Sequence, residues 1–222
     1  MAENIKDPEV MRRASELSSF LVNYEKCDCI LVDSNFCAMG RMIAVEACEN
    51  SKYTYYDGYE LLKLMELSDE EIKKITSFDE VLDTYTGSIK DLRDSERFKY
   101  VVSMYNKAIK KALEKGPALI HERGVRSYIK ELGYSVMGII LYTSNVEYRR
   151  QRALVSAYCK KLVDEGMSVD EAIRRQDRRR ELYHNGQTDE LWGALSSYDL
   201  CIGTDQIGKK QATALLSYIL NM

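Results

Sequence analysis

The sequence predicts an α/β fold in which helices cover both faces of a five-stranded parallel sheet. Five short apolar segments alternate with longer amphipathic segments, as in chains built from strand-helix-strand units. Residues 135–143, SVMGIILYT, lack the alternation of a half-exposed strand, which indicates burial on both faces. The composition is that of an ordinary globular chain, with 45% hydrophobic residues, 30% charged residues and 2 prolines, so we expect one domain over residues 1–222.

The expected strands are short and are separated by helical segments. We predict them at residues 27–33, 53–57, 118–122, 135–143 and 198–204. The segment 58–94 has no strand of its own and is predicted to be an insertion of short helices. One of these helices is opened by Ser68 and Glu71, which have the spacing of a capping box.

The helices are predicted from their periodicity and their end signals. They are expected at about residues 7–24, 40–50, 95–115, 123–133, 145–165, 168–184 and 206–220. Asp7 and Pro8 are the N-cap and the first residue of the N-terminal helix. Asn185 and Gly186 are expected to break the chain. The segment 1–26 either covers an edge of the sheet or mediates a homodimer, and the sequence leaves both alternatives open.

Charge and composition exclude several classes of protein. A net charge of -3 argues against binding to a nucleic acid polymer, which needs a basic surplus. No apolar segment is long enough for a membrane span and no signal pattern opens the chain, so we expect a cytoplasmic protein without a membrane partner. The six cysteines are expected to be reduced, with Cys27 and Cys29 on one face of a strand. With only two histidines, His121 and His184, no metal site is predicted.

The carboxyl ends of parallel strands are where such folds bind ligands. This rule selects residues 33–41, 57, 121–123, 143–145 and 204 for inspection. The first range lies in VDSNFCAMGRMIA, where a strand gives way to a helix. A phosphate loop of the type GxxxxGK[ST] would place Asn35, Gly40, Arg41 and Met42 at its defining positions, and only the glycine of Gly40 is retained. An ordinary strand-to-helix turn explains the segment equally well.

Two arginine-rich segments are candidates for binding anions. The segment 174–181, RRQDRRRE, is either a solvated helix face or a lid that closes over phosphates. Arg149, Arg150 and Arg152 form a second basic group. Arg123, beside Gly124 at a strand end, either binds a phosphate or forms a salt bridge.

The order of these segments resembles the cytidylate kinase-like branch of the nucleoside monophosphate kinases. The family pattern SREYGSGGREIA is matched by DSNFCAMGRMIA, and FYDKELI by YYDGYELL. VGRGA is matched by HERGV, DKRRAAYY by DRRRELYH, and YDLVLNTSKLG by YDLCIGTDQIG. No single match is specific, but five in the same order extend from about Cys27 to the C-terminus.

The resemblance implies a P-loop NTPase-like sandwich with strand order 2-3-1-4-5, an acceptor-binding insertion at 58–94 and a lid at 168–190. It implies transfer of the γ-phosphoryl group of ATP, with Mg²⁺, to a nucleoside monophosphate such as CMP. Asp57 and Arg123 would bind this acceptor. The residues that would bind the donor nucleotide are Phe36, Cys37, Ala38, Met39, Gly40, Arg41 and Met42. The residues that would neutralise charge during transfer are Arg41, Arg178, Arg179 and Arg180.

The chain departs from the family pattern at the phosphate loop. Cys37, Ala38 and Met39 precede Gly40 where the pattern is rich in glycine, and Met42 offers no hydroxyl to Mg²⁺. His121 stands where active cytidylate kinases have an aspartate. The sequence therefore leaves open an active phosphotransferase, a pseudoenzyme that binds a nucleotide or another anion or acts as an interaction module, and a relative that binds no nucleotide.

Overall fold

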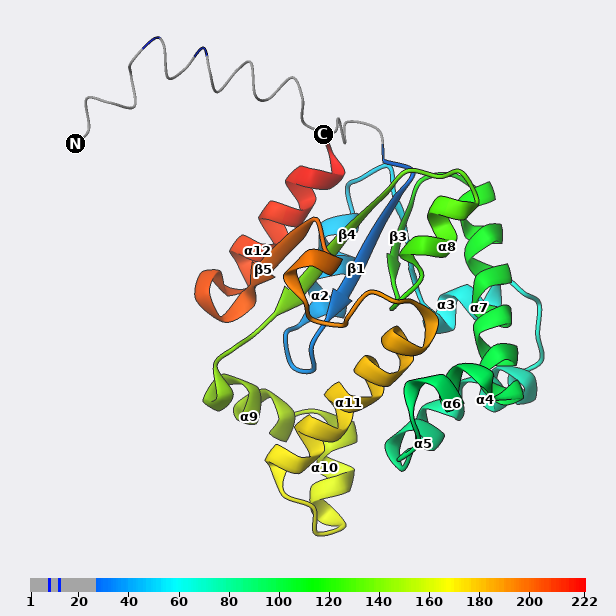
Figure 1. The fold of residues 1–222 in the computed structure, drawn as a ribbon. Helices are drawn as coiled ribbons and strands as arrows, with labels where there is room; N and C mark the ends of the chain where they lie inside the picture. Colours follow the sequence, from blue (N-terminus) through cyan, green and yellow to red (C-terminus); the bar gives the residue numbers. More distant parts are fainter. Residues whose placement is uncertain (1–7, 9–11, 13–26) are drawn as a thin grey trace.

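The computed structural model describes Pro8, Arg12 and residues 27–222, so the expected N-terminal helix lies outside the described residues. Five parallel strands form one sheet in the order β2-β3-β1-β4-β5, which confirms the predicted fold class (Figure 1). The strands are β1 (Cys29–Ser34), β2 (Thr54–Asp57), β3 (Ala118–His121), β4 (Val136–Tyr142) and β5 (Leu200–Gly203).

The register of the sheet brings the ends of three strands together. Asp57 at the end of β2 pairs with His121 at the end of β3, and Ser34 at the end of β1 pairs with Leu141. Strand β1 lies between β3 and β4, in the middle of the sheet. Polar residues that end different strands are therefore neighbours at one edge, as the sequence predicted.

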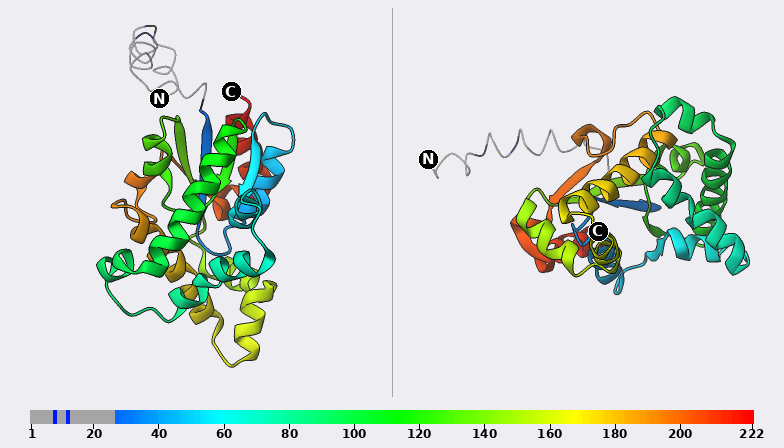
Figure 2. Two further views of the ribbon diagram at one scale, coloured as in Figure 1. Left: turned by 90° about the vertical axis from the view of Figure 1, so that its right-hand side faces the viewer. Right: turned by 90° about the horizontal axis from the view of Figure 1, so that it is seen from below.

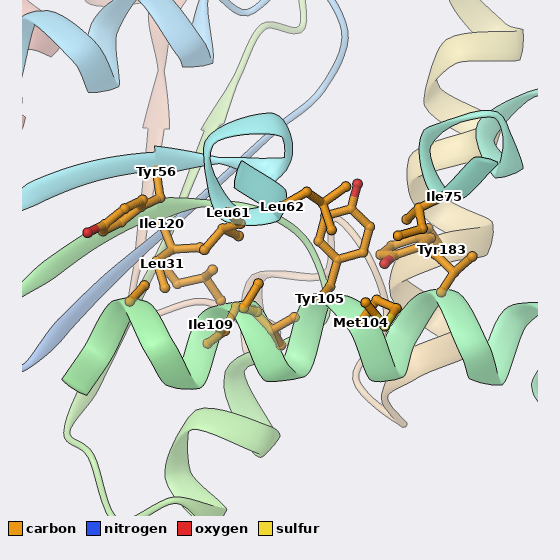
Figure 3. Close-up of a cluster of buried hydrophobic side chains, with 14 of the residues drawn as sticks. Leu31, Tyr56, Leu61, Leu62, Ile75, Met104, Tyr105, Ile109, Ile120 and Tyr183 are labelled. Carbon is orange, nitrogen blue, oxygen red and sulfur yellow. The ribbon is translucent and has the colours of Figure 1, made fainter. Parts of the chain in front are cut away.

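Each face of the sheet packs against its own helices. Helices α2 (Gly40–Cys48) and α12 (Thr204–Leu220) share a core cluster with Ile30 and Val32, while α7 (Glu96–Glu114) and α8 (Arg126–Glu131) share another with Cys29 and Leu31. Figure 3 shows this second cluster along α7. Cys27 belongs to the first cluster, so the expectation that Cys27 and Cys29 share a face is wrong: strand alternation begins only at Cys29.

The insertion after β2 consists of short helices, as predicted. They are α3 (Gly58–Lys63), α4 (Asp69–Thr76), α5 (Phe78–Asp83) and α6 (Ile89–Asp94). The capping box of Ser68 and Glu71 is formed at the start of α4, and Ser88 and Asp91 form a second one at α6. Because each helix buries one or two apolar residues against α7 or its neighbours, the insertion extends the core rather than standing apart from it.

The segment 145–165 was expected to be one helix, and this is wrong. It forms α9 (Val146–Leu154) and α10 (Ala157–Asp164), with the break at Val155 and Ser156. Ser156 has extended dihedrals and is the N-cap of α10. The break lets Ala153 and Cys159 face the same small core cluster against the next helix.

Helix α11 (Val169–Gln187) continues through Asn185 and Gly186, so the predicted chain break is also wrong. A Cβ at Gly186 would lie 2.5 Å from the Phe98 ring, so this packing requires glycine inside the helix. Arg93 donates hydrogen bonds to the carbonyls of Asn185 and Thr188, which stabilises the end of the helix.

The helices beyond the carboxyl ends of the strands form two groups, α9 with α10 and α4 to α6. The view from below in Figure 2 shows α11 between them. A short 3-10 helix, η2 (Leu195–Ser197), follows before β5. In the part of the chain that the structure describes, no helix has both the length and the apolar character of a membrane span.

Candidate functional site

A cavity of about 240 Å³ lies at the carboxyl edge of the sheet, between the ends of β1, β2 and β3, the insertion and α11. Aromatic side chains of α5, α7 and α11 form part of its wall, and Figure 3 shows Tyr105 and Tyr183 among them. The charged residues that line it are Asp33, Asp57, Asp79, Glu122, Arg123 and Arg180. The cavity is therefore polar at the sheet and partly aromatic at the helices.

Arg123 and Arg180 bring two guanidinium groups to this cavity from β3 and α11. Among the described residues, neither guanidinium forms an ion pair with a carboxylate; Arg180 donates one hydrogen bond to the Gln176 carbonyl at 2.8 Å. Their planes lie over aromatic rings, Arg123 at 5.9 Å from the Tyr183 centroid and Arg180 at 5.2 Å from that of Phe36. Both guanidinium groups thus face the cavity without an ion-pair partner among the described carboxylates.

The pKa values around these arginines show the effect of burial and of the repulsion between them, although the charges of Glu122, Asp79 and Asp33 raise the pKa of Arg123. Burial and the neighbouring Arg123 lower the pKa of Arg180 to about 10. Burial lowers the pKa of His121 to about 4, and Arg123 and Arg180 act in the same direction. An anion between the two guanidinium groups would relieve this repulsion, which is how such sites bind phosphate.

Glu122 places a buried carboxyl group in the same cavity. Burial raises its pKa to about 7, although the charge and the backbone N–H of Arg123 favour the ionised form. A Cβ at Gly58 would lie 2.8 Å from Glu122 Oε2, so a glycine is needed where β2 turns into α3. Sequence inspection passed over Glu122 although the strand-end rule had selected its position.

Asp33, the last residue but one of β1, is held by three polar groups. It accepts hydrogen bonds from the Ser34 N–H at 2.7 Å and the Tyr198 hydroxyl at 3.0 Å, and His184 Nδ1 lies 3.5 Å away. Burial opposes its ionisation, but the contacts with His184 and the charge of Arg123 keep its pKa below the ordinary value. His184 and Tyr198 come from distant segments, and no local signal in the sequence identifies them.

Arg41 and Asp57, which were assigned to different substrates, form an ion pair with each other. Arg41 Nη2 lies 2.8 Å from Asp57 Oδ2, and the Arg41 side chain is 69% exposed and does not line the cavity. Asp57 also caps α3 by accepting the N–H groups of Tyr59 and Glu60. The carboxylate at the end of β2 is thus fully engaged by protein groups.

The arginines of the lid segment have separate partners. Arg178 is exposed and pairs with a glutamate of its own helix. Arg179 is buried and pairs with Asp79 at 2.8 Å and Asp83 at 3.3 Å, both on α5. Of these three arginines only Arg180 lines the cavity, while Arg179 holds α11 to the insertion.

The loop that follows β1, residues 35–39, has an unusual backbone. Cys37 and Met39 have φ values of 72° and 65°, in the left-handed region that glycine adopts without strain. These two residues stand at glycines of the family pattern quoted above. Gly40 is retained for a further reason, because a Cβ there would lie 2.4 Å from Ser34 Oγ. The loop therefore has the path of a glycine-rich turn without its glycines.

The oxygen ligands that Mg²⁺ requires are not assembled at this loop. Met42 is 51% exposed and carries no oxygen, and His121 occupies the position of the expected aspartate. Asp33 and Asp57 are already engaged by hydrogen bonds or an ion pair. Among the described residues no group of three or more His, Cys, Asp and Glu side chains is placed to hold a metal ion. The residues present do not fit the ion.

Comparisons with known proteins agree with this fold. A crystal structure of an uncharacterized protein from Eubacterium ventriosum ATCC 27560 matches with a TM-score of 0.55 and 18% identity, over 86% of this chain and 97% of that one. No curated protein matches the sequence. The profile of the cytidylate kinase-like family matches residues 29–206, which include β1, the insertion, α11 and β5. The chain therefore belongs to the cytidylate kinase-like family.

Proposed function

We propose that the cavity binds a nucleoside monophosphate, with the phosphate between Arg123 and Arg180. The observation that carries this proposal is the pair of guanidinium groups that face one cavity and form no ion pair with any described carboxylate. A phosphate accepts several charge-assisted hydrogen bonds from such a pair, and bidentate contacts to arginine fix its orientation. Family membership makes a pyrimidine nucleotide such as CMP the first candidate ligand.

The other charges of the cavity support an anionic ligand. Three of its four carboxylates already have protein partners: Asp33, Asp57 and Asp79. The fourth, Glu122, is neutral in part near pH 7 because burial raises its pKa to about 7. A ligand that enters between Arg123 and Arg180 therefore meets two guanidinium groups, while Asp57 and Asp79 are neutralised by Arg41 and Arg179. The rings of Phe78 and Tyr105 are suited to contact with a base.

Phosphoryl transfer from ATP to the bound monophosphate is a second candidate function. It is favoured by the left-handed backbone at Cys37 and Met39, which keeps the turn of a phosphate loop. Phosphoryl transfer depends mainly on positioning and charge stabilisation, and Arg180 already faces the cavity. Arg41 would have to leave Asp57 to reach a donor phosphate, and Arg179 would have to leave α5, so catalysis requires a rearrangement.

Calorimetric titration with CMP, UMP, AMP and GMP tests the binding proposal. We expect Arg123→Gln and Arg180→Gln to weaken binding of the preferred nucleotide at least about tenfold, since a hydrogen bond to a charged group contributes roughly 1.5–3 kcal/mol. Arg174→Gln is the matched control, because Arg174 is an exposed arginine of the same helix outside the cavity. Absence of binding by every monophosphate, or equal losses in all three variants, would refute the proposal.

The transfer reaction is tested by adding ATP and Mg²⁺ to the saturated complex. Formation of ADP and a nucleoside diphosphate in equal amounts, dependent on the monophosphate, would establish the second candidate. Unchanged ATP with intact monophosphate binding would leave a nucleotide-binding protein without transferase activity.

A further inference from the structure

Helix α11 contacts the phosphate loop through a carboxylate. Asp177 Oδ1 accepts the backbone N–H of Phe36 at 2.8 Å. Arg149 of α9 donates its Nε to the Phe36 carbonyl at 3.1 Å and pairs with the other carboxylate oxygen of Asp177. The side chains of Arg149 and Asp177 are 17% and 20% exposed. One peptide group on each side of Phe36 is thus held by the same ion pair.

The surroundings of the loop are otherwise basic. Burial raises the pKa of the Cys37 thiol to about 11, and Arg149, Arg152 and Arg180 oppose this rise, which places three arginines near the loop. Arg180 stacks on the Phe36 ring and Arg152 on a ring of its own helix. Asp177 supplies the negative charge where the loop begins, and its ion pair occupies Arg149.

We propose that Asp177 is an internal anion that keeps the donor side of this site closed, so that an oligophosphate must displace it from Phe36 and Arg149. The inference rests on the second candidate function and concerns the donor side alone. Phosphate loops present backbone N–H groups to phosphate oxygens, and here a carboxylate oxygen accepts the N–H of Phe36. The contact is autoinhibitory because the same carboxylate also pairs with Arg149 and so neutralises a cation beside the loop.

The charge of Asp177, as well as the space that its side chain occupies, keeps the donor side closed. An oligophosphate that approaches Phe36 would meet the Asp177 carboxylate, and the repulsion between the two anions opposes binding. Release of Asp177 would remove one negative charge and free the guanidinium of Arg149 in a single step. Arg175 and Arg179 hold α11 to the insertion independently of this contact.

Binding of inorganic tripolyphosphate to the full chain tests this inference, because the probe carries the charges of the donor without a base. We expect Asp177→Asn to bind it at least tenfold more tightly than the wild type, since the isosteric amide keeps the shape of the side chain and lacks its charge. Asp177→Ala should show a similar gain, and the double variant Asp177→Asn with Arg149→Gln should lose most of it.

Asp170→Asn is the matched control. Asp170 lies on the same helix and pairs with Arg150 of α9 at 2.6 Å, so its loss also removes one acid and frees one arginine, but without the hydrogen bond to Phe36. An unchanged affinity in Asp177→Asn, or an equal gain in Asp170→Asn, would overturn the inference. CMP titrations of the same folded variants report on the acceptor cavity separately, so a failure of the proposed nucleotide binding is recognised independently of the tripolyphosphate result.

Discussion

The proposed acceptor cavity and the loop after β1 that resembles a phosphate loop lie at the same edge of the sheet. They differ in which features of a nucleotide site they have. The cavity retains ligand chemistry: Arg123 and Arg180 face it, while the carboxylates around them have protein partners. The loop has the backbone path of a glycine-rich turn, with Cys37 and Met39 in left-handed conformations, but it has no glycine at these two positions and no hydroxyl at Met42. In the cavity, the two guanidinium groups form no ion pair with any described carboxylate. In the loop, the N–H of Phe36 is already hydrogen-bonded to Asp177.

This difference shows that backbone path and ligand chemistry are held by different contacts. The path of the loop is set by neighbours that remain, namely Ser34 packed against Gly40 and Asp177 hydrogen-bonded to Phe36. A non-glycine residue in the left-handed region costs roughly 1–2 kcal/mol and persists only where surrounding contacts impose it. The backbone path of the loop can therefore be present without the glycines of the family pattern. Binding of the acceptor can be tested separately from binding of the donor.

The largest expected effect concerns the ion pairs of Asp83 with Arg175 and Arg179, which hold α11 to the insertion and which we call the clasp. The Asp83 side chain is 4% exposed, pairs with Arg175 at 3.0 Å and with Arg179 at 3.3 Å, and accepts the Tyr158 hydroxyl at 3.1 Å. We expect Asp83→Ala to lower the free energy of unfolding by roughly 3–5 kcal/mol, because it removes a buried carboxylate that pairs with both Arg175 and Arg179 and leaves the buried Arg179 with Asp79 alone. Urea unfolding followed by circular dichroism measures this loss.

Asp79→Ala is the comparison for that clasp. Asp79 contacts the same Arg179 but its side chain is 43% exposed, so its loss should cost about 1 kcal/mol or less. Equal losses in the two variants would mean that Asp83 does not anchor the clasp. The cavity could then no longer be described as a site that Arg123 and Arg180 face while Arg179 is held away from it by α5.

An intermediate effect is expected at Glu122, with a defined dependence on pH. Its pKa is raised by burial from the ordinary 4.5 to about 7, so the stability that this group contributes is fully present below 4.5 and is lost as the pH rises through 7. Glu122→Gln cannot ionise, so its stability relative to the wild type should increase by roughly 3 kcal/mol between pH 4 and pH 8. Urea unfolding at the two pH values measures this.

The same variant sharpens the comparison between cavity and loop. Above pH 7, where Glu122 ionises, Glu122→Gln should bind CMP more tightly than the wild type, and this difference should disappear at lower pH, where Glu122 is neutral. The exposed Glu131 serves as the control, since Glu131→Gln should leave both profiles unchanged. A wild-type stability difference between pH 4 and pH 8 that Glu122→Gln fails to alter would contradict the assignment.

The fold and the location of the site could be predicted because their signals are local. Apolar segments marked the five strands, the capping box of Ser68 and Glu71 marked a helix start, and the strand-end rule selected the positions of Asp33, Glu122 and Arg123. These signals depend on residues close in sequence and on the general geometry of parallel sheets. The strand order followed from the family resemblance.

The partners of the charged residues could not be predicted, because they join distant segments. The hydrogen bond between Phe36 and Asp177 spans 141 residues, and the clasp of Arg175 to Asp83 spans 92. Gly186 looked like a chain break because glycine is a local signal, and only its packing against Phe98 explains a glycine within a helix. Local sequence patterns identify the charged residues, but they do not show which of these residues form ion pairs with each other.

The smallest effect concerns the loop backbone itself, and it separates conformation from packing. Met39→Gly and Met39→Ala both remove the side chain that packs on the core, but only glycine relaxes the φ of 65°. We expect the glycine variant to be more stable than the alanine variant by about 1 kcal/mol, after subtraction of the greater freedom of glycine in the unfolded chain. At Ala38, which has no positive φ, Ala38→Gly should instead destabilise by about 1 kcal/mol. If glycine and alanine have the same effect at Met39, the left-handed path is not imposed by the fold, and the loop cannot be described as a phosphate loop that kept its backbone.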